Sequence, residues 1–218
     1  MARIARVVIP NCPHHVTQRG NRRMQTFFSA DDYLRYIEFM SESCQAAGTA
    51  VWAYCLMPNH IHLIMVPSDA DGLRRPIAAA HWRYTRHINF RHNWRGHLWQ
   101  ERFFSTPMDE VYLHNAVRYV EQNPVTASLC AEAADWQWSS ARAHLSATDD
   151  ALVMVAPMLE RIRDYSEYIR QPLSAESSRE LELHLRTGRP MGSATFLDAI
   201  EASLGRSVRP RKAGRKAR

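Results

Sequence analysis

The order of apolar and polar positions predicts a single alternation of strands and helices over the first part of the chain. Four short runs rich in β-branched and aromatic residues predict strands at residues 6–17, 51–56, 60–66 and 98–105. Three stretches with apolar residues at helical spacing predict helices at about 29–48, 73–90 and 109–123. The resulting order, β-α-β-β-α-β followed by a helix, predicts an α+β fold of the ferredoxin-like type. We expect an antiparallel sheet with helices on one face.

Beyond Asn123 the pattern changes to helices separated by turns. Trp136 to Ser140 predicts a packed turn, and further helices are expected at about 157–170, 174–186 and 194–204. The chain closes with a basic segment that starts at Arg206 and has the composition of a flexible tail. We therefore predict three parts: a main domain at 1–128, a helical C-terminal extension at 129–205 and a basic, flexible tail at 206–218.

Charge is unevenly spread along the 218 residues. The net charge is +6 over residues 1–108, −7 over 109–201 and +7 over 202–218. The first half and the tail therefore have the sign expected of a protein that binds a polyanion. Of the 28 basic residues, 26 are arginine, which suits bidentate contact with phosphate. A GC-rich genome is the alternative explanation of this bias.

Bulk composition excludes several classes of protein. No apolar run approaches the roughly 20 residues that cross a bilayer, and the N-terminus shows no signal-peptide pattern. The four cysteines lie far apart, without a C-x-x-C pair, so we expect reduced and mostly buried thiols. The sequence predicts a cytoplasmic protein with no membrane partner.

His60 and His62 are the first candidates for chemistry, because they stand two residues apart in an apolar run. Successive side chains of a strand alternate between faces, so both imidazoles point one way while Ile61 and Leu63 point into a core. Two neutral imidazoles on a rigid strand are ready ligands for a divalent metal and leave coordination positions open. Since the chain has 11 histidines, a chance pair on one strand face is the plainer interpretation.

Tyr119 and Asn123 stand one helical turn apart, before Pro124. A phenol, with an ordinary pKa of about 10, becomes a nucleophile when a neighbour helps it lose its proton. Arg118, Arg102 and the histidines are candidates for that help. The Asn123 carbonyl oxygen suits a third ligand for Mg²⁺ or Mn²⁺. The hypothesis is a metal-assisted tyrosine that attacks a phosphodiester; the plainer interpretation is that Tyr119 packs and Asn123 ends a helix.

Three segments of the chain, at 54–63, 96–105 and 118–125, resemble the REP-associated tyrosine transposases. These are single-tyrosine HUH endonucleases, related to small insertion-sequence transposases that act on single-stranded DNA. In this chain the three segments have the sequences YCLMPNHIHL, GHLWQERFFS and RYVEQNPV, in that order. Segments at 15–21, 138–140 and 187–190 also resemble the family, so the likeness covers roughly residues 7–205. H-x-H alone is a weak motif, whereas its combination with Y-x-x-x-N-P in this order is specific.

The resemblance implies an enzyme that cleaves and rejoins single-stranded DNA at palindromic hairpins, with Mg²⁺ or Mn²⁺ as cofactor. Tyr119 matches the nucleophile, which would leave a 5′-phosphotyrosine and a free 3′-hydroxyl. His60 and His62 match the metal pair, and Asn123 matches the third ligand position. Residues 1–128 would then form the catalytic domain, in a monomer or a homodimer, and the substrate would be repetitive extragenic palindromes (REP).

Candidate DNA contacts are polar or basic residues of the family segments and arginines that alternate with aromatic residues. They are His15, Thr17, Arg19, Arg22, Arg83, Arg86, Arg102 and Arg118. The intervening aromatic rings suit stacking on unpaired bases, although Trp82 and Trp99 could equally belong to the core.

Two other functions remain open from the sequence. A domesticated transposase could bind DNA hairpins as a regulator without cleaving them, and the charge pattern supports this equally well. A pure binder would, however, have no need of Tyr119, His60, His62 and Asn123 together. A phosphoesterase of small nucleotides is supported by the H-x-H pair alone.

Overall fold

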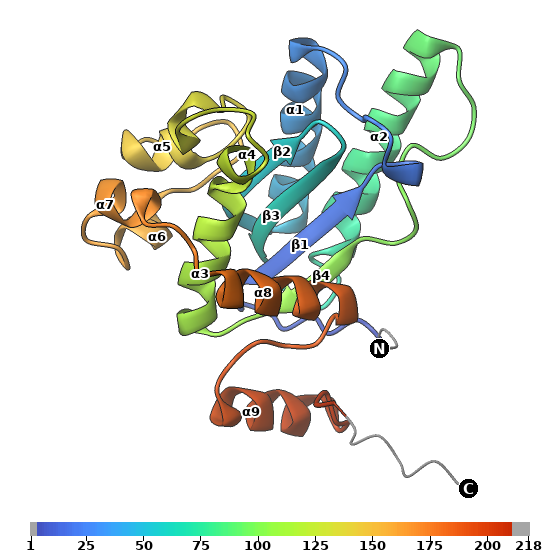
Figure 1. Cartoon of the computed structure of the whole chain (residues 1–218). Coiled ribbons are helices and arrows are strands. Elements are labelled where there is room, and N and C mark those ends of the chain that lie inside the picture. Colours follow the sequence, from blue (N-terminus) through green and yellow to red (C-terminus); the bar gives the residue numbers. More distant parts are fainter. Residues whose placement is uncertain (1–3, 211–218) are drawn as a thin grey trace, which may run out of the picture.

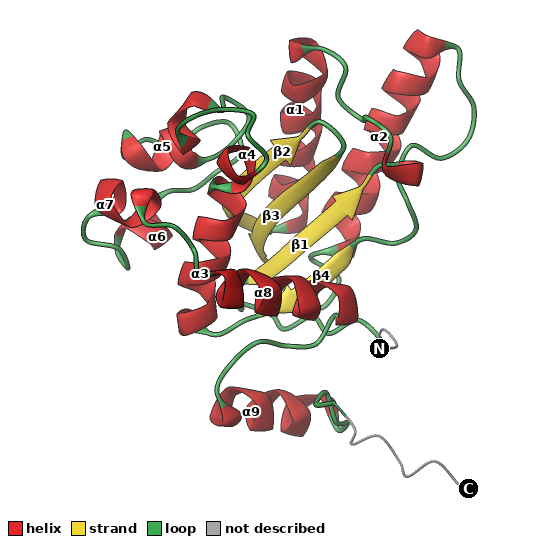
Figure 2. Ribbon diagram, viewed as in Figure 1, coloured by secondary structure: helices red, strands yellow, loops and turns green. Residues whose placement is uncertain are grey.

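The computed structural model describes residues 4–210 and centres on a four-stranded antiparallel sheet (Figures 1 and 2). The strands are β1 (His14–Arg19), β2 (Ala50–Met57), β3 (His60–Val66) and β4 (Phe104–Pro107). Their order across the sheet is β2-β3-β1-β4, and every neighbouring pair is antiparallel. With one long helix between β1 and β2 and another between β3 and β4, this is the predicted ferredoxin-like arrangement.

Two long helices, α1 (Ala30–Ala47) and α2 (Arg74–His92), cover one face of the sheet. As predicted, α1 begins after Ser29, whose side chain forms a capping box with Asp32, and ends at Gly48. Gly48 has a φ of 63°, the left-handed conformation that glycine adopts without steric cost. The core between helices and sheet is formed by large side chains with little or no exposure, among them Val16, Tyr36, Ile61, Leu63 and Tyr84.

The other face of the sheet is covered as well, so the prediction that helices occupy one face only is wrong. The helix α3 (Glu110–Glu121) packs there, and the short α4 (Asn123–Thr126) follows it. The physical reason is that β2 is apolar on both faces and that β3 adds Ile64 to the second one. Ala53, Cys55 and Ile64 form a second buried surface against α3.

Several element boundaries also differ from the sequence prediction. The first strand begins at His14 rather than Arg6, because residues 10–12 form a turn in which Asn11 has a φ of 58°. The last strand is confined to Phe104–Pro107, while Trp99 makes only an isolated bridge with Gly20. The expected helix at 157–170 is interrupted over residues 160–164, and the Asp164 side chain caps the second helix by accepting from the backbone N–H of Glu167.

The segment after α4 contains several short helices and two longer ones. They are η2 (Ala133–Asp135), α5 (Ala141–Leu145), α6 (Ala156–Leu159), α7 (Tyr165–Arg170), α8 (Ala175–Thr187) and α9 (Ala194–Leu204). Trp138 joins this segment to the main domain, because its carbonyl accepts from Leu56 at the edge of β2 and its ring stacks on Tyr33. The division into domains at residue 128 stays a prediction.

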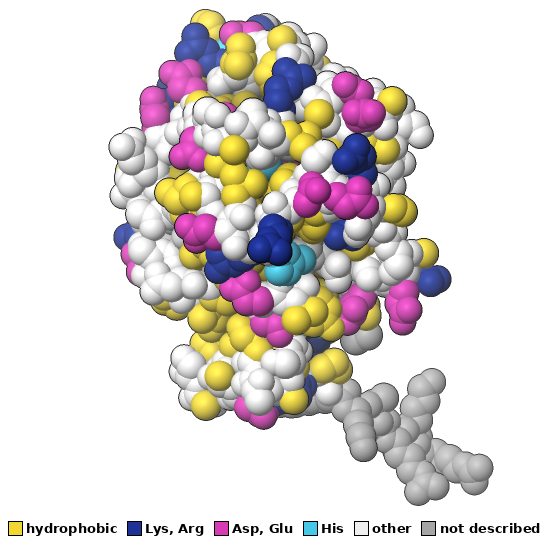
Figure 3. Space-filling view, turned by 90° about the vertical axis from the view of Figure 1, so that its left-hand side faces the viewer, with side chains coloured by type: hydrophobic (Ala, Val, Ile, Leu, Met, Phe, Trp, Pro, Cys, Tyr) yellow, Lys and Arg dark blue, Asp and Glu magenta, His cyan; other side chains and the backbone are white. Residues whose placement is uncertain are grey.

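The helix α9 forms a lobe at the lower end of the molecule (Figures 1 and 3). Ile200 of α9 packs against Val7 and Val208 in a small apolar cluster. Arg206 and Val208 belong to the tail predicted to be flexible, yet Val208 is buried and Arg206 bonds to the carbonyl of Ala5. Residues 206–210 are therefore part of the fold, and 211–218 lie outside the described residues. Within 4–210, no helix is both long and apolar enough to cross a membrane.

Candidate active site

His60 and His62 lie side by side on β3, on the face of the sheet that α3 covers. Their ring centroids are 5.0 Å apart. His62 is buried opposite Thr17 of β1, and His60 is half-buried opposite Arg19. Because strand side chains alternate, Ile61 between them faces the core under α1 and α2. The two imidazoles are thus arranged as the strand pattern predicts.

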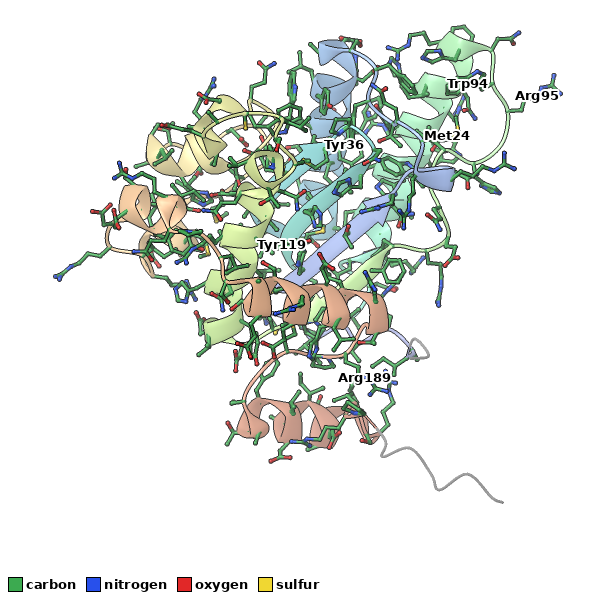
Figure 4. All side chains as sticks on the ribbon, in the orientation of Figure 1. Met24, Tyr36, Trp94, Arg95, Tyr119 and Arg189 are labelled. Carbon is green, nitrogen blue, oxygen red and sulfur yellow. The ribbon has the colours of Figure 1, made fainter. Side chains whose placement is uncertain are left out.

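Tyr119 lies in the last turn of α3 (Figure 4), and its ring is close to this pair. Its ring centroid is 5.6 Å from that of His62 and 5.9 Å from that of His15. Asn123, one turn further along at the start of α4, lines the same pocket as Tyr119 and His60, and its side chain affects the pKa of both. One strand and two consecutive helices therefore bring a phenol, a carboxamide and two imidazoles together around one pocket.

These side chains line a pocket of about 960 Å³ between the sheet, the α3–α4 junction and the segment from α7 to α8. The helix α8 crosses beside β1 and β4 (Figure 1) and contributes Glu182, Leu185 and Arg186 to the lining. Four arginines surround the pocket: Arg19, Arg23, Arg170 and Arg186. A pocket with this many guanidinium groups suits an anionic ligand with several phosphates.

The surroundings keep Tyr119 protonated and the histidines neutral near pH 7. Burial raises the pKa of Tyr119, and the Glu182 carboxylate raises it further, while Asn123, Arg19 and Arg186 act in the opposite direction. Burial and the nearby Arg19 lower the pKa of His60 to about 4, against a smaller opposite effect of Asn123. Burial, reinforced by the nearby His60, His15 and Arg19, holds the pKa of His62 well below its ordinary value. Neutral imidazole is the form that binds metals.

The donor set at this site fits a divalent cation. Within residues 4–210, no three His, Cys, Asp or Glu side chains form a metal-binding group, so the candidate set is His60, His62 and the amide oxygen of Asn123. The Nδ1 of His60 is 2.7 Å from the Asn59 Oδ1, and the Nδ1 of His62 is 2.9 Å from the His15 Nε2. In each ring the Nδ1 is engaged by a neighbour, so Nε2 is the nitrogen that could face a metal, and three protein ligands would leave coordination positions open.

The predicted DNA contacts fall into two groups, one of which lies at or beside the pocket. Thr17 and Arg19 line it, and the Thr17 hydroxyl also donates to the Ile61 carbonyl at 2.8 Å. Arg22 is exposed in the short helix η1 (Asn21–Arg23), next to the pocket-lining Arg23.

The second group lies elsewhere. His15, predicted as a DNA contact, is only 1% exposed and sits behind His62 in this structure. Arg83 pairs with Glu42 of α1 at 2.5 Å. The guanidinium of Arg118 lies over the ring of Tyr168, since consecutive helix positions are about 100° apart and Arg118 cannot share the face of Tyr119.

Arg86 and Arg102 are exposed but do not line the pocket. Arg86 lies on α2 over the ring of Trp82, which is itself 60% exposed, so Trp82 is not part of the core. Trp99 is buried and belongs to the core. Arg102 lines a second pocket of about 430 Å³ on the other side of Gln18.

Sequence analysis missed the parts of the site that depend on tertiary packing. Asn59 could have been found, since it directly precedes His60 and can hold its Nδ1. Glu182 and Arg186 gave no such signal, because the pattern of α8 does not show which surface it covers.

Comparison with known proteins assigns a family to these features. The family model described as "Transposase IS200 like" matches residues 8–123. A curated protein of Haemophilus influenzae named "Putative REP-associated tyrosine transposase" is 30% identical over 123 residues, which cover 50% of this chain and 69% of that protein. A solved structure of a REP-associated tyrosine transposase bound to a REP hairpin superposes with a TM-score of 0.59 at 19% identity, over 69% of this chain and 90% of the other. At that identity the structural likeness is one of fold.

Proposed function

The chain belongs to the IS200-like transposases, and we propose that it cleaves and rejoins single-stranded DNA at REP-like hairpins with Tyr119 as nucleophile. One observation carries the proposal: Tyr119, His60, His62 and Asn123 converge in a single arginine-lined pocket. A hairpin is the proposed partner because the similar solved structure is bound to one.

In the proposed reaction the Tyr119 hydroxyl oxygen attacks a phosphorus atom of the strand. A bond forms between that oxygen and the phosphorus, and the bond from phosphorus to the 3′-oxygen breaks. The phenol proton is lost to water, and the departing 3′-oxygen takes up a proton to give a free 3′-hydroxyl. The 5′-phosphate stays on Tyr119, so a later attack by a 3′-hydroxyl rejoins a strand and releases the tyrosine without an external energy source.

The residues around Tyr119 have separate roles in this proposal. His60, His62 and Asn123 would hold Mg²⁺ or Mn²⁺, which when bound supplies positive charge beside the reacting phosphate. Arg19 and Arg186 line the pocket and lower the pKa of Tyr119, opposing the effect of its burial. Their guanidinium groups also suit contact with phosphate oxygens, which positions the strand.

A suicide oligonucleotide that carries the hairpin tests the nucleophile. We expect the wild-type chain to form a covalent adduct that survives denaturing electrophoresis, and Tyr119→Phe to form none while still binding the hairpin. Tyr112→Phe is the matched control, because Tyr112 lies on the same helix but donates its hydroxyl hydrogen to Glu180. A 5′-linked adduct that persists in Tyr119→Phe rules out Tyr119 as the nucleophile.

The same assay tests the metal and the competing function. His60→Ala or a chelator should abolish the adduct, and full activity in the presence of chelator removes the metal from the proposal. Hairpin binding by the wild-type chain with no adduct under any metal would favour the DNA-binding regulator instead.

A further inference from the structure

His15 is a buried residue whose contact with the proposed metal pair has a specific form. It lies on β1, diagonally across from His62 on β3, where Thr17 is the direct partner of His62. The His15 Nε2 is 2.9 Å from the His62 Nδ1, and the two ring centroids are 5.1 Å apart. The 2.9 Å between the two nitrogens is the length of a hydrogen bond, so one of these nitrogens donates and the other accepts.

The neighbouring ligand His60 shows what such a contact does. Its Nδ1 is 2.7 Å from the Asn59 Oδ1, and the orientation of that amide is fixed because the Asn59 Nδ2 donates to the Arg23 carbonyl. The Asn59 Oδ1 can only accept, so the proton of His60 sits on Nδ1. The Nε2 of His60 therefore carries the lone pair that a metal requires.

For His62 the corresponding partner is His15, and here two arrangements are possible. If His62 donates from Nδ1, its Nε2 carries a lone pair and His15 must hold its own proton on Nδ1. If His15 donates from Nε2, the proton of His62 sits on Nε2, and that nitrogen cannot bind a metal. Both rings are buried, which favours neutral imidazoles and limits the pair to these two tautomeric arrangements.

The surroundings of the His15 Nδ1, the nitrogen that points away from His62, favour neither tautomeric arrangement over the other. Its Nδ1 is buried and has no hydrogen-bond partner within residues 4–210, so neither tautomer is fixed from behind. A ligand that needs the lone pair of the His62 Nε2 would select the arrangement in which His62 donates.

We propose that His15 is a positioning residue for His62: its Nε2 accepts the His62 Nδ1 proton, orients that ring and directs its Nε2 lone pair to the divalent ion. This role rests on the metal pair of the proposed function. His15 makes no contact with the substrate in this scheme and acts only through His62, as Asn59 acts through His60.

Nitrogen-15 spectra of the histidine rings test the tautomers directly. In the full chain loaded with Mg²⁺, we expect His62 and His15 each to carry the proton on Nδ1. A loaded protein in which His15 is protonated on Nε2 overturns the proposal. The measurement is independent of activity, and it requires no variant that could fail to fold.

Metal affinity of two variants gives a second, independent readout. His15→Gln keeps an acceptor near the position of Nε2, whereas His15→Leu has none. By titration calorimetry with Mn²⁺, we expect His15→Gln to bind within about threefold of wild type and His15→Leu to bind roughly 10- to 100-fold more weakly. Wild-type affinity in a folded His15→Leu contradicts the role, and so does an equal loss in both variants.

His14→Gln is the matched control, because His14 is equally buried but is hydrogen-bonded to the backbone of Ile9 and Cys12 rather than to His62. It should leave Mn²⁺ affinity unchanged. The outcomes separate the two proposals. If the wild-type chain binds no metal, both the proposed function and the role of His15 are contradicted. If the wild-type chain binds Mn²⁺ and forms the Tyr119 adduct, but His15→Leu leaves the Mn²⁺ affinity unchanged, only the inference on His15 is contradicted.

Discussion

At the scale of single residues, Tyr119 stands in an environment that opposes its proposed chemistry. It must lose a proton to attack, yet burial and the Glu182 carboxylate both raise its pKa. Arg186 acts in the opposite direction from the same helix, one turn after Glu182, and the two are 3.6 Å apart as an ion pair. The balance of these charges sets how easily the phenol ionises.

Replacing Glu182 should therefore make Tyr119 more reactive. In Glu182→Gln the negative charge that raises the pKa of Tyr119 is gone and Arg186 is released from its partner, so the pKa falls. We expect adduct formation at pH 7 to rise roughly twofold to fivefold and the pH profile to move to lower pH. Rates of adduct formation between pH 6 and 9 check this.

Glu180→Gln serves as the control for that measurement, because Glu180 lies on the same helix but accepts from Tyr112 instead. Its pH profile should match that of wild type. A slower Glu182→Gln, or a profile displaced to higher pH, contradicts the assigned effect of Glu182.

At the scale of elements, a buried carboxylate joins α3 to the segment that follows α4. Glu121, two residues after Tyr119, is fully buried. It accepts hydrogen bonds from Ser140 at 2.5 Å, from the His144 Nδ1 at 2.7 Å and from the Tyr165 hydroxyl at 2.7 Å. Ser140 and His144 belong to the cap and body of α5, and Tyr165 begins α7. The Glu121 side chain therefore links its own helix, α3, to α5 and α7.

Loss of this carboxylate should be costly, because it leaves three buried donors without their acceptor. We expect Glu121→Ala to lower the free energy of unfolding by about 3–5 kcal/mol. Glu110→Ala, at the other end of α3, removes an ion pair with Arg161 in which the glutamate is 62% exposed, and it should cost less than about 1 kcal/mol. Urea unfolding of both variants checks the difference, and similar losses would contradict the structural role of Glu121.

At the scale of the whole molecule, the pocket is the place where four arginines line one cavity. On the face that Figure 3 turns toward the viewer, acidic and basic side chains are interspersed. Of the sequence-predicted arginines, Arg19 lines the pocket while Arg83 is paired with Glu42. The arginines at the pocket are therefore the ones we expect to meet DNA.

Salt dependence of hairpin binding distinguishes these two arginines. Arg19→Gln should weaken binding and reduce the slope of log K against log salt by about 0.7, the value for one phosphate contact on a single strand. Arg83→Gln should leave the slope unchanged. Fluorescence anisotropy from 50 to 300 mM salt measures both, and an equal effect of the two substitutions would contradict a DNA path through the pocket.

Much of this architecture can be predicted from the local order of residues in the sequence. The capping box at Ser29, the hairpin turn at Pro58 and the alternation through His60 and His62 each depend on residues close in sequence. Alternation and helical spacing are properties of the backbone, so they place both imidazoles on one face and Tyr119 and Asn123 one turn apart, whatever surrounds them.

The second covered face of the sheet, the position of α8 over the pocket and the burial of His15 were decided only by tertiary structure. Each depends on packing between segments far apart in the chain, and packing selects among surfaces that look alike in a linear pattern. His15 illustrates the difference: the chain alone gives a polar residue on a strand near the site, whereas the fold buries its ring against His62 and Tyr119.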